Sequence, residues 1–314
     1  MVRLGGQHGK VATQQTAGTE KLLQREGCPC LHEERTGRPP PSLCGENSAS
    51  VFEYGLKRKR RVVYNKLSQK TIKEVVLLQP AYKRILLKLS GEALSNNAQD
   101  GRCIDGSFLT ALCEKIAQIT KLGVQVAVVC GGGNIWRGRT VPEMDRTRAD
   151  QSGMMATIIN GLALEDALIR QGVQAVLLTA FEVGPVGRRY TVVEAERILN
   201  EGGVAVLAGG TGHPFFTTDS GAALRAAELQ VDAILMAKTI DGVYTADPKK
   251  DSSAVFLPEI TCTEALYRRL GVMDATAMAL CMDNHITIRV FAMSPLDNLM
   301  KVVCGEPIGS VVTG

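Results

Sequence analysis

The pattern of apolar and polar positions along the chain changes near residue 80. From Tyr82 onward, short apolar runs alternate with longer segments in which apolar residues recur every three or four positions. The runs predict strands buried on both faces, and the longer segments predict amphipathic helices. The predicted strands are 84–89, 124–130, 175–178, 204–208, 233–237 and 286–292. The predicted helices are 107–122, 154–169, 192–199, 219–229, 263–270 and 274–283, with another after Pro295 and a hairpin-like stretch after 237.

Strands that alternate with helices in this way predict an α/β fold with a mostly parallel sheet covered on both faces. Ligands of such sheets bind beyond the carboxyl ends of the strands, so the residues that follow each strand carry the most information. Four strand ends are rich in Gly, Lys, Arg, Thr or Asp. They are 88–91, 131–134 followed by Arg137, the loop 209–219, and Lys238 followed by 241–248.

These strand ends have the chemistry of a phosphate-binding cleft. Glycines let backbone N–H groups approach an anion, helix N-termini offer further donors, and Lys88 and Arg137 add positive charge. Thr217 and Thr218 precede a predicted helix and can either cap it or bind a ligand, and Asp219 falls in its first turn. The sequence contains neither GxxxxGK[ST] nor a GxGxxG after the first strand, which argues against P-loop and nicotinamide-dinucleotide sites.

Residues 1–79 predict a disordered or non-native extension, because they lack sustained apolar periodicity until Ile72. The first 80 residues hold 14 Lys and Arg against 7 Asp and Glu, whereas the rest of the chain is mildly acidic and predicts no nucleic-acid partner. No Met lies between Met1 and Met144, and 75–78 are Val or Leu, which GUG or UUG start codons would encode. We therefore expect the working protein to begin near Val75. The rival is a regulatory or targeting tail that uses the basic run 57–61.

Cysteine usage and hydropathy predict a cytoplasmic protein. The nine cysteines are irregularly spaced and several lie inside apolar runs, which is typical of buried thiols in a reducing compartment. No apolar h-region opens the chain and no run of 18 apolar residues occurs, so no membrane segment is predicted. Cys28 and Cys30, followed by His32, lack the usual zinc-ligand spacing, and no metal-ligating residue is assigned.

Six segments stand out: KRILLKLSGEAL (83–94), GGGNIWRG (131–138), DQSGMMAT (150–157), GGTGHPFFTTD (209–219), DGVYTADP (241–248) and VMD (272–274). In order and spacing they resemble the motifs of bacterial uridylate (UMP) kinases of the amino-acid-kinase superfamily. The resemblance runs from about Tyr82 to Val312. It implies a three-layer αβα sandwich, here the domain 80–314, that transfers phosphate from ATP to UMP with Mg²⁺ in pyrimidine nucleotide biosynthesis.

The resemblance also implies a role for particular residues. Around ATP it places Lys88, Leu89, Ser90, Gly91, Gly133, Arg137, Lys238, Tyr244 and Asp247. Around UMP it places Gly132, Asp150, Thr211, Gly212, His213, Pro214, Phe215, Phe216, Thr217 and Thr218, with Asp150 accepting hydrogen bonds from the ribose hydroxyls. The candidate catalytic residues are Lys88, Arg137 and Asp219. Lys238 is expected to contact ATP or to act as a catalytic cation.

The expected mechanism needs no general base, because the acceptor phosphate is already mostly ionised near neutral pH. Lys88, Arg137 and Mg²⁺ would neutralise charge as the two nucleotides meet, and Asp219 would orient lysine side chains or metal-bound water.

Family members are typically hexamers that GTP activates and UTP inhibits, so a homohexamer is expected. Residues 96–103 replace a Gly-Phe-Gly loop often tied to GTP activation, which leaves that regulation open, and His213 stands where asparagine is common. Two alternatives remain: another kinase of the amino-acid-kinase fold, and a non-catalytic nucleotide-binding protein of that fold. The loop 209–219 disfavours the first, and retention of Lys88, Arg137 and Asp219 disfavours the second.

Overall fold

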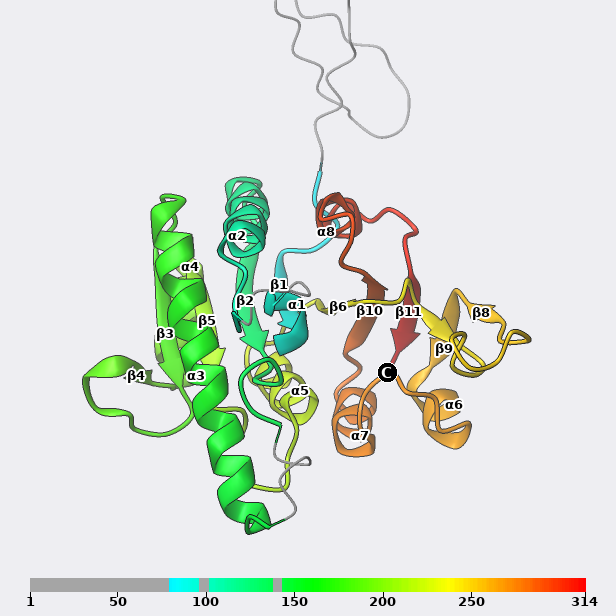
Figure 1. Cartoon of the computed structure of the whole chain (residues 1–314). Coiled ribbons are helices and arrows are strands. Elements are labelled where there is room, and N and C mark those ends of the chain that lie inside the picture. Colours follow the sequence, from blue (N-terminus) through cyan, green and yellow to red (C-terminus); the bar gives the residue numbers. More distant parts are fainter. Residues whose placement is uncertain (1–78, 96–101, 138–142) are drawn as a thin grey trace, which may run out of the picture. The chain divides into compact units, whose positions relative to one another are not determined.

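A nine-stranded sheet organises the part of the chain that this computed structural model describes, residues 79–95, 102–137 and 143–314 (Figure 1). The strand order is β4-β3-β5-β2-β1-β6-β10-β11-β9, and all neighbours are parallel except β10 and β11. The strands are β1 (Arg84–Leu89), β2 (Gln125–Cys130), β3 (Ala175–Thr179), β4 (Arg188–Arg189), β5 (Val204–Ala208), β6 (Ala233–Lys238), β9 (Glu259–Thr261), β10 (Thr287–Ala292) and β11 (Ser310–Thr313). An antiparallel ribbon pairs β7 (Val243–Tyr244) with β8 (Phe256–Leu257).

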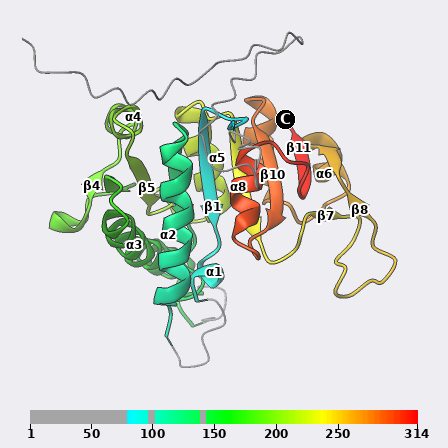
Figure 2. The same cartoon turned by 90° about the horizontal axis from the view of Figure 1, so that it is seen from above.

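Helices cover both faces of the sheet and make the three layers that the sequence predicts (Figures 1 and 2). The helices are α1 (Gly91–Ser95), α2 (Gly106–Lys121), α3 (Arg146–Arg170), α4 (Val192–Asn200), α5 (Thr218–Glu228), α6 (Cys262–Tyr267), α7 (Ala275–Asp283) and α8 (Asp297–Val303). One hydrophobic core contains residues of α2, α3 and α8, and the other contains residues of α4, α5, α6 and α7. In β1, Ile85 and Leu87 belong to the first core and Leu86 to the second, as the alternation of side chains along a strand requires.

The order of the central strands brings the four predicted strand ends to one edge. β5, β2, β1 and β6 are consecutive neighbours and run in the same direction. The loops that follow them therefore leave the sheet side by side, in the place where parallel sheets bind ligands.

The predicted elements agree with the structure to within a few residues, except at α3. This helix begins at Arg146 rather than near residue 154, because Asp145 caps it and its first two turns carry mainly polar side chains. Polar turns leave no apolar periodicity to detect. The short elements α1, β4, β9 and β11 were not predicted, since so few residues give too little pattern.

Several expectations concern residues outside the described ranges, namely the extension up to residue 78 and most of the loop 96–103. The six cysteines in the described ranges are free thiols, of which Cys113, Cys130, Cys262 and Cys281 are buried. Burial raises the pKa of Cys130 to about 12, so this thiol stays protonated and unreactive at neutral pH. In the ranges that the structure describes, no helix combines the length and hydrophobicity needed to span a bilayer.

Candidate active site

Two cavities open at the carboxyl edge of the sheet. The larger, about 720 Å³, lies among residues that follow β1 and β6, the β7–β8 ribbon and the segment 268–272. The smaller, about 240 Å³, lies between the glycine loop after β2, the N-terminal half of α3 and the loop after β5. Two cavities of unequal size at one sheet edge suit two ligands of unequal size.

The residues predicted to surround ATP fall into three groups. Lys88, Ser90, Lys238, Tyr244 and Asp247 line the larger cavity. Gly133 lines the smaller cavity instead. Neither cavity is lined by Leu89, Gly91 or Arg137. Leu89 is fully buried in the core, so its side chain supports the site from below rather than contacting a ligand.

Most residues predicted to surround UMP lie together. The smaller cavity is lined by Gly132, Asp150, Thr211, His213, Phe216, Thr217 and Thr218. Gly212, Pro214 and Phe215 belong to the same loop but do not line the cavity.

Helix α3 holds both glycine-rich loops in place. The buried side chain of Asn160 donates to the carbonyl oxygen of Gly131 at 2.7 Å, and the hydroxyl of Thr157 accepts from the backbone N–H of Gly209 at 2.8 Å. Buried hydrogen bonds of this kind are costly to break, because the groups left behind find no water. The loops after β2 and β5 are therefore fixed to one helix.

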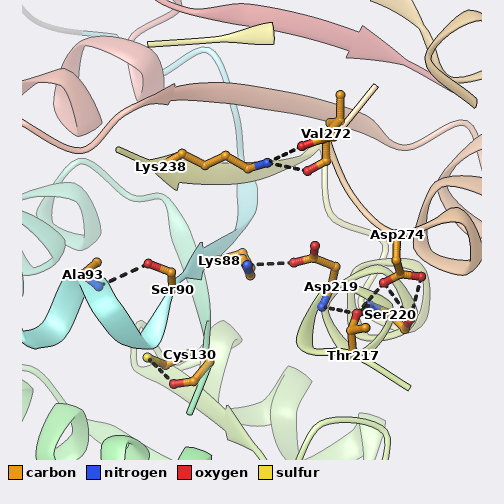
Figure 3. Close-up of polar contacts among 12 residues, drawn as sticks. Lys88, Ser90, Ala93, Cys130, Thr217, Asp219, Ser220, Lys238, Val272 and Asp274 are labelled. Carbon is orange, nitrogen blue, oxygen red and sulfur yellow. Dashed lines mark hydrogen bonds and ion pairs between the residues drawn. The ribbon is translucent and has the colours of Figure 1, made fainter. Parts of the chain in front are cut away.

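An ion pair joins the strand β1 to the helix α5. Lys88 Nζ lies 2.7 Å from Asp219 Oδ1, and the two side chains are 14% and 22% exposed (Figure 3). Asp219 stands in the first turn of α5, where the helix dipole favours a negative charge, and Thr217 caps that helix by accepting from the N–H groups of Asp219 and Ser220. Thr217 thus fills the capping role, which is one of the two roles expected for the threonines.

Lys238 adds a second cation beside this pair. Its Nζ donates to the carbonyl oxygens of Gly271 and Val272, at 3.1 and 2.5 Å. Burial lowers the pKa of Lys238, the charge of Asp219 acts in the opposite direction, and the charge of Lys88 lowers it further. The larger cavity is lined by five cationic side chains against two anionic ones, so it carries a net positive charge that suits an anionic ligand; they are Lys88, Lys238, Lys249, Arg268 and Arg269 against Glu92 and Asp247.

Glu92 and Arg137 form a contact that the sequence analysis did not identify. Arg137 Nη2 lies 2.9 Å from Glu92 Oε1, and Arg137 Nε donates to the carbonyl oxygen of Gly133 at 3.0 Å. Glu92 lines the larger cavity. It lies within the first motif, two residues after Ser90, but nothing in the local sequence indicates that its partner is 45 residues away.

Arg146 is a second residue that the sequence analysis missed. Asp150 Oδ2 accepts from Arg146 Nε and from the backbone N–H of Phe215, both at 2.8 Å. The Arg146 guanidinium also lies 5.3 Å from the centre of the Phe215 ring. Phe215 has φ +72°, a strained conformation for an aromatic residue, and such strain is typical of functional loops. Arg146 and Asp150 are four residues apart, which is the spacing of an ion pair along one face of a helix. This signal could not be used from the sequence, because the predicted helix began only at residue 154.

Comparisons with known proteins agree with this geometry. The model of the amino acid kinase family matches residues 83–292. A uridylate kinase from Parabacteroides distasonis is 47% identical over 233 residues, which cover 74% of this chain and 98% of that protein. The crystal structure of UMP kinase from Bacillus anthracis has a TM-score of 0.71 at 35% identity, covering 74% of this chain and 96% of that one. The structure of UMP kinase from Ureaplasma parvum has a TM-score of 0.70 at 41% identity, with coverages of 74% and 99%.

The chain therefore belongs to the amino acid kinase family, and within it to the uridylate kinases. The resemblance carried by the six motifs is confirmed, and so is the α/β sandwich that it implies.

The packing around Gly91 generates a test of the site. A Cβ placed on Gly91 would meet the backbone N of Gly133 at 2.6 Å and the carbonyl oxygen of Gly131 at 2.8 Å, whereas one on Gly106 would meet nothing within 4 Å. We expect Gly91→Ala to lower the free energy of unfolding by about 1–3 kcal/mol, because the glycine loop cannot move away without strain. Gly106→Ala, at the start of α2, should leave it unchanged or raise it. Urea denaturation checks both, and equal midpoints would contradict the close packing.

Proposed function

We propose that this protein is a UMP kinase that transfers the γ-phosphoryl group of ATP to UMP, giving ADP and UDP. The observation that carries the proposal is the Lys88–Asp219 ion pair and its position. Lys88 lines the larger cavity, and Asp219 directly follows Thr217 and Thr218, which line the smaller one. The larger cavity suits the larger nucleotide, ATP, and the smaller cavity suits UMP.

The chemistry asks the protein to bring two polyanions together. The acceptor phosphate of UMP is its own nucleophile, because a phosphate monoester has a second pKa of about 6 and is mostly ionised at neutral pH. In this proposal the larger cavity holds ATP and is the donor cavity. Lys88 and Lys238 line it as cations that stabilise the charge of the transferred group, and Asp219 holds Lys88 in place. Arg137, at the edge of the glycine loop, is a further cation that a phosphate would attract from Glu92.

The residues present fit a Mg²⁺ ion that arrives with the nucleotide. In the described ranges, no group of three or more His, Cys, Asp or Glu side chains could hold a metal. Kinases commonly bind Mg²⁺ through one or two carboxylates together with substrate phosphates, and Asp219 supplies one carboxylate beside the donor cavity. When bound, the ion would neutralise phosphate charge.

Asp150 suits recognition of the ribose. Its hydrogen bonds from Arg146 and from the backbone of Phe215 both fall on Oδ2, and the residue lines the smaller cavity. A carboxylate accepts hydrogen bonds only, so it selects a ligand that presents hydroxyl donors. We expect the ribose diol of UMP to be that ligand.

Family resemblance further leads us to expect a cytoplasmic homohexamer that UTP inhibits. GTP activation is an open question for this chain, because its loop 96–103 departs from the family pattern.

An assay of ADP release tests the activity directly. The purified full chain should release ADP from ATP with UMP as acceptor, and release much less with CMP, aspartate or carbamate. Preference for aspartate or carbamate would instead indicate another reaction of the same fold, and no release with any acceptor would indicate a binding protein.

Lys88 should be essential for turnover. We expect Lys88→Ala to lower kcat by about 10²–10³-fold, the usual effect of removing one preorganised charge from a transition state. Lys83→Ala, an exposed lysine at the start of the same segment, is the matched control and should leave kcat unchanged. Circular dichroism should show both variants folded, and near-normal kcat in Lys88→Ala would remove this residue from the mechanism.

Asp150 should govern the affinity for the acceptor. We expect Asp150→Asn to raise the KM for UMP by about tenfold or more, since hydrogen bonds to a charged acceptor contribute about 1.5–3 kcal/mol, while the KM for ATP stays within about twofold. Asp166→Asn, which alters an exposed ion pair with Arg170 on the same helix, is the control. Equal changes in both KM values would count against a ribose contact.

The lowered pKa of Lys238 predicts a pH dependence. As pH rises through that lowered pKa, Lys238 loses its charge. The value of kcat/KM for ATP should therefore begin to fall at a lower pH than it would if Lys238 had the pKa of an ordinary lysine. Lys238→Arg should move this alkaline limb to higher pH, because arginine remains charged. Lys249→Arg, an exposed lysine of the same cavity, should leave the limb in place. An identical limb in Lys238→Arg would show that another group titrates.

A further inference from the structure

One carboxylate, that of Asp274, joins the starts of two helices. Asp274 is the N-cap of α7, where its Oδ1 accepts from the backbone N–H groups of Thr276 and Ala277 at 3.0 and 3.1 Å. These two hydrogen bonds satisfy free backbone N–H groups in the first turn of α7, and an N-cap requires no others.

The same carboxylate also receives two hydroxyl groups from α5 and its cap. Ser220 Oγ lies 3.1 Å from both oxygens of Asp274, and Thr217 Oγ1 donates to Oδ2 in a short hydrogen bond (Figure 3). Ser220 is almost fully buried. These contacts cross 54 and 57 residues of sequence and serve no purpose in capping α7.

The direction of the Thr217 hydrogen bonds follows from the acceptor-only character of a carboxylate. Thr217 Oγ1 accepts from the backbone N–H groups of Asp219 and Ser220, so its lone pairs face α5. Its single proton must then point to Asp274. Asp274 thus fixes the rotamer of the residue that caps α5, and with it the first turn that carries Asp219.

The two segments that Asp274 joins belong to different cavities. Thr217 and Thr218 line the smaller cavity, whereas Gly271 and Val272, just before Asp274, line the larger one. Gly271 and Val272 also accept the hydrogen bonds of Lys238. Asp274 therefore lies between the wall that positions Asp219 and the wall that positions Lys238.

We propose that Asp274 is a positioning residue for phosphoryl transfer. It holds the α5 cap against the start of α7, and so fixes the positions of Asp219, Lys88 and Lys238 relative to one another across the two cavities. The inference rests on the proposed kinase activity. Asp274 itself is not required to touch either nucleotide, so its loss should affect the catalytic step more than substrate binding. A shift of about 1 Å at a reacting group can cost about a hundredfold in rate.

A series of cap-preserving variants separates positioning from capping. Ser, Asn and Asp cap helices about equally well, so Asp274→Ser and Asp274→Asn should both keep α7 capped. Serine is too short to reach α5, whereas asparagine keeps the shape and one acceptor oxygen. We expect kcat to fall in the order wild type, Asn, Ser, with Asp274→Ser reduced about tenfold or more and each KM within about threefold. Asp105→Ser, the same change at the cap of α2, should leave kcat unchanged.

Stability and a double-mutant cycle complete the test. Thermal melting should show that Asp274→Asn and Ser220→Ala fold, and Ser220→Ala should lower kcat in the wild-type background but not further in Asp274→Ser. Equal kcat in wild type, Asn and Ser, or a loss of kcat that only follows the folded fraction, would overturn the inference. If Asp274→Ser does not fold, unchanged kcat in both Asp274→Asn and Ser220→Ala would overturn it equally. A wild-type protein that does not phosphorylate UMP would remove the proposed function itself, and the positioning role with it.

Discussion

The parallel pairing of β5, β2, β1 and β6 is the constraint on which the rest of the site depends. Each strand ends at the same edge, so four loops from distant parts of the chain meet there. Lys88 stands in register with Val129 on one side and Met236 on the other. A slip of one residue would turn the Lys88 side chain to the opposite face of the sheet and remove it from the cleft. The buried alternation of Leu86 and Leu87 between two cores prevents that slip.

The charges of the cleft are balanced for an anionic ligand rather than for stability alone. Two lysines and one aspartate are brought close together in a half-buried place, and burial there lowers the pKa of Lys238. Asp219 offsets part of the repulsion between the lysines, and the phosphates of the proposed nucleotides would complete the neutralisation. The loops after β2 and β5 are fixed to α3 through Asn160 and Thr157, and they hold these charges in a rigid environment. The proposed phosphoryl transfer would therefore need little reorganisation of the site.

Local patterns in the sequence predicted most of the fold and much of the site. Apolar runs located the long strands, and the motifs identified Lys88 and Asp219. In the structure, Lys88 Nζ lies 2.7 Å from Asp219 Oδ1. What could not be predicted depends on partners that are remote in sequence. Glu92 and Arg137 lie 45 residues apart, and Asp274 and Thr217 lie 57 apart, so no periodicity or propensity reports their contact. The start of α3 was missed for another reason: a cap and side-chain ion pairs stabilise its first turns, and apolar burial is nearly absent there.

The position of β1 in the sheet also has a consequence for how the protein acquires its activity. This strand comes first among the described elements but lies at the centre of the sheet, and the bonds from Arg84 to Asp232 at the start of β6 span 148 residues. Pairings of such long range form late, because closing a long loop costs entropy before any contact is gained. β1 can pair with β2 early, but the larger cavity needs β6 as its other wall. A chain folded only through β5 therefore contains Lys88 without Asp219 or Lys238, and the complete set of charges assembles only when most of the sheet is in place.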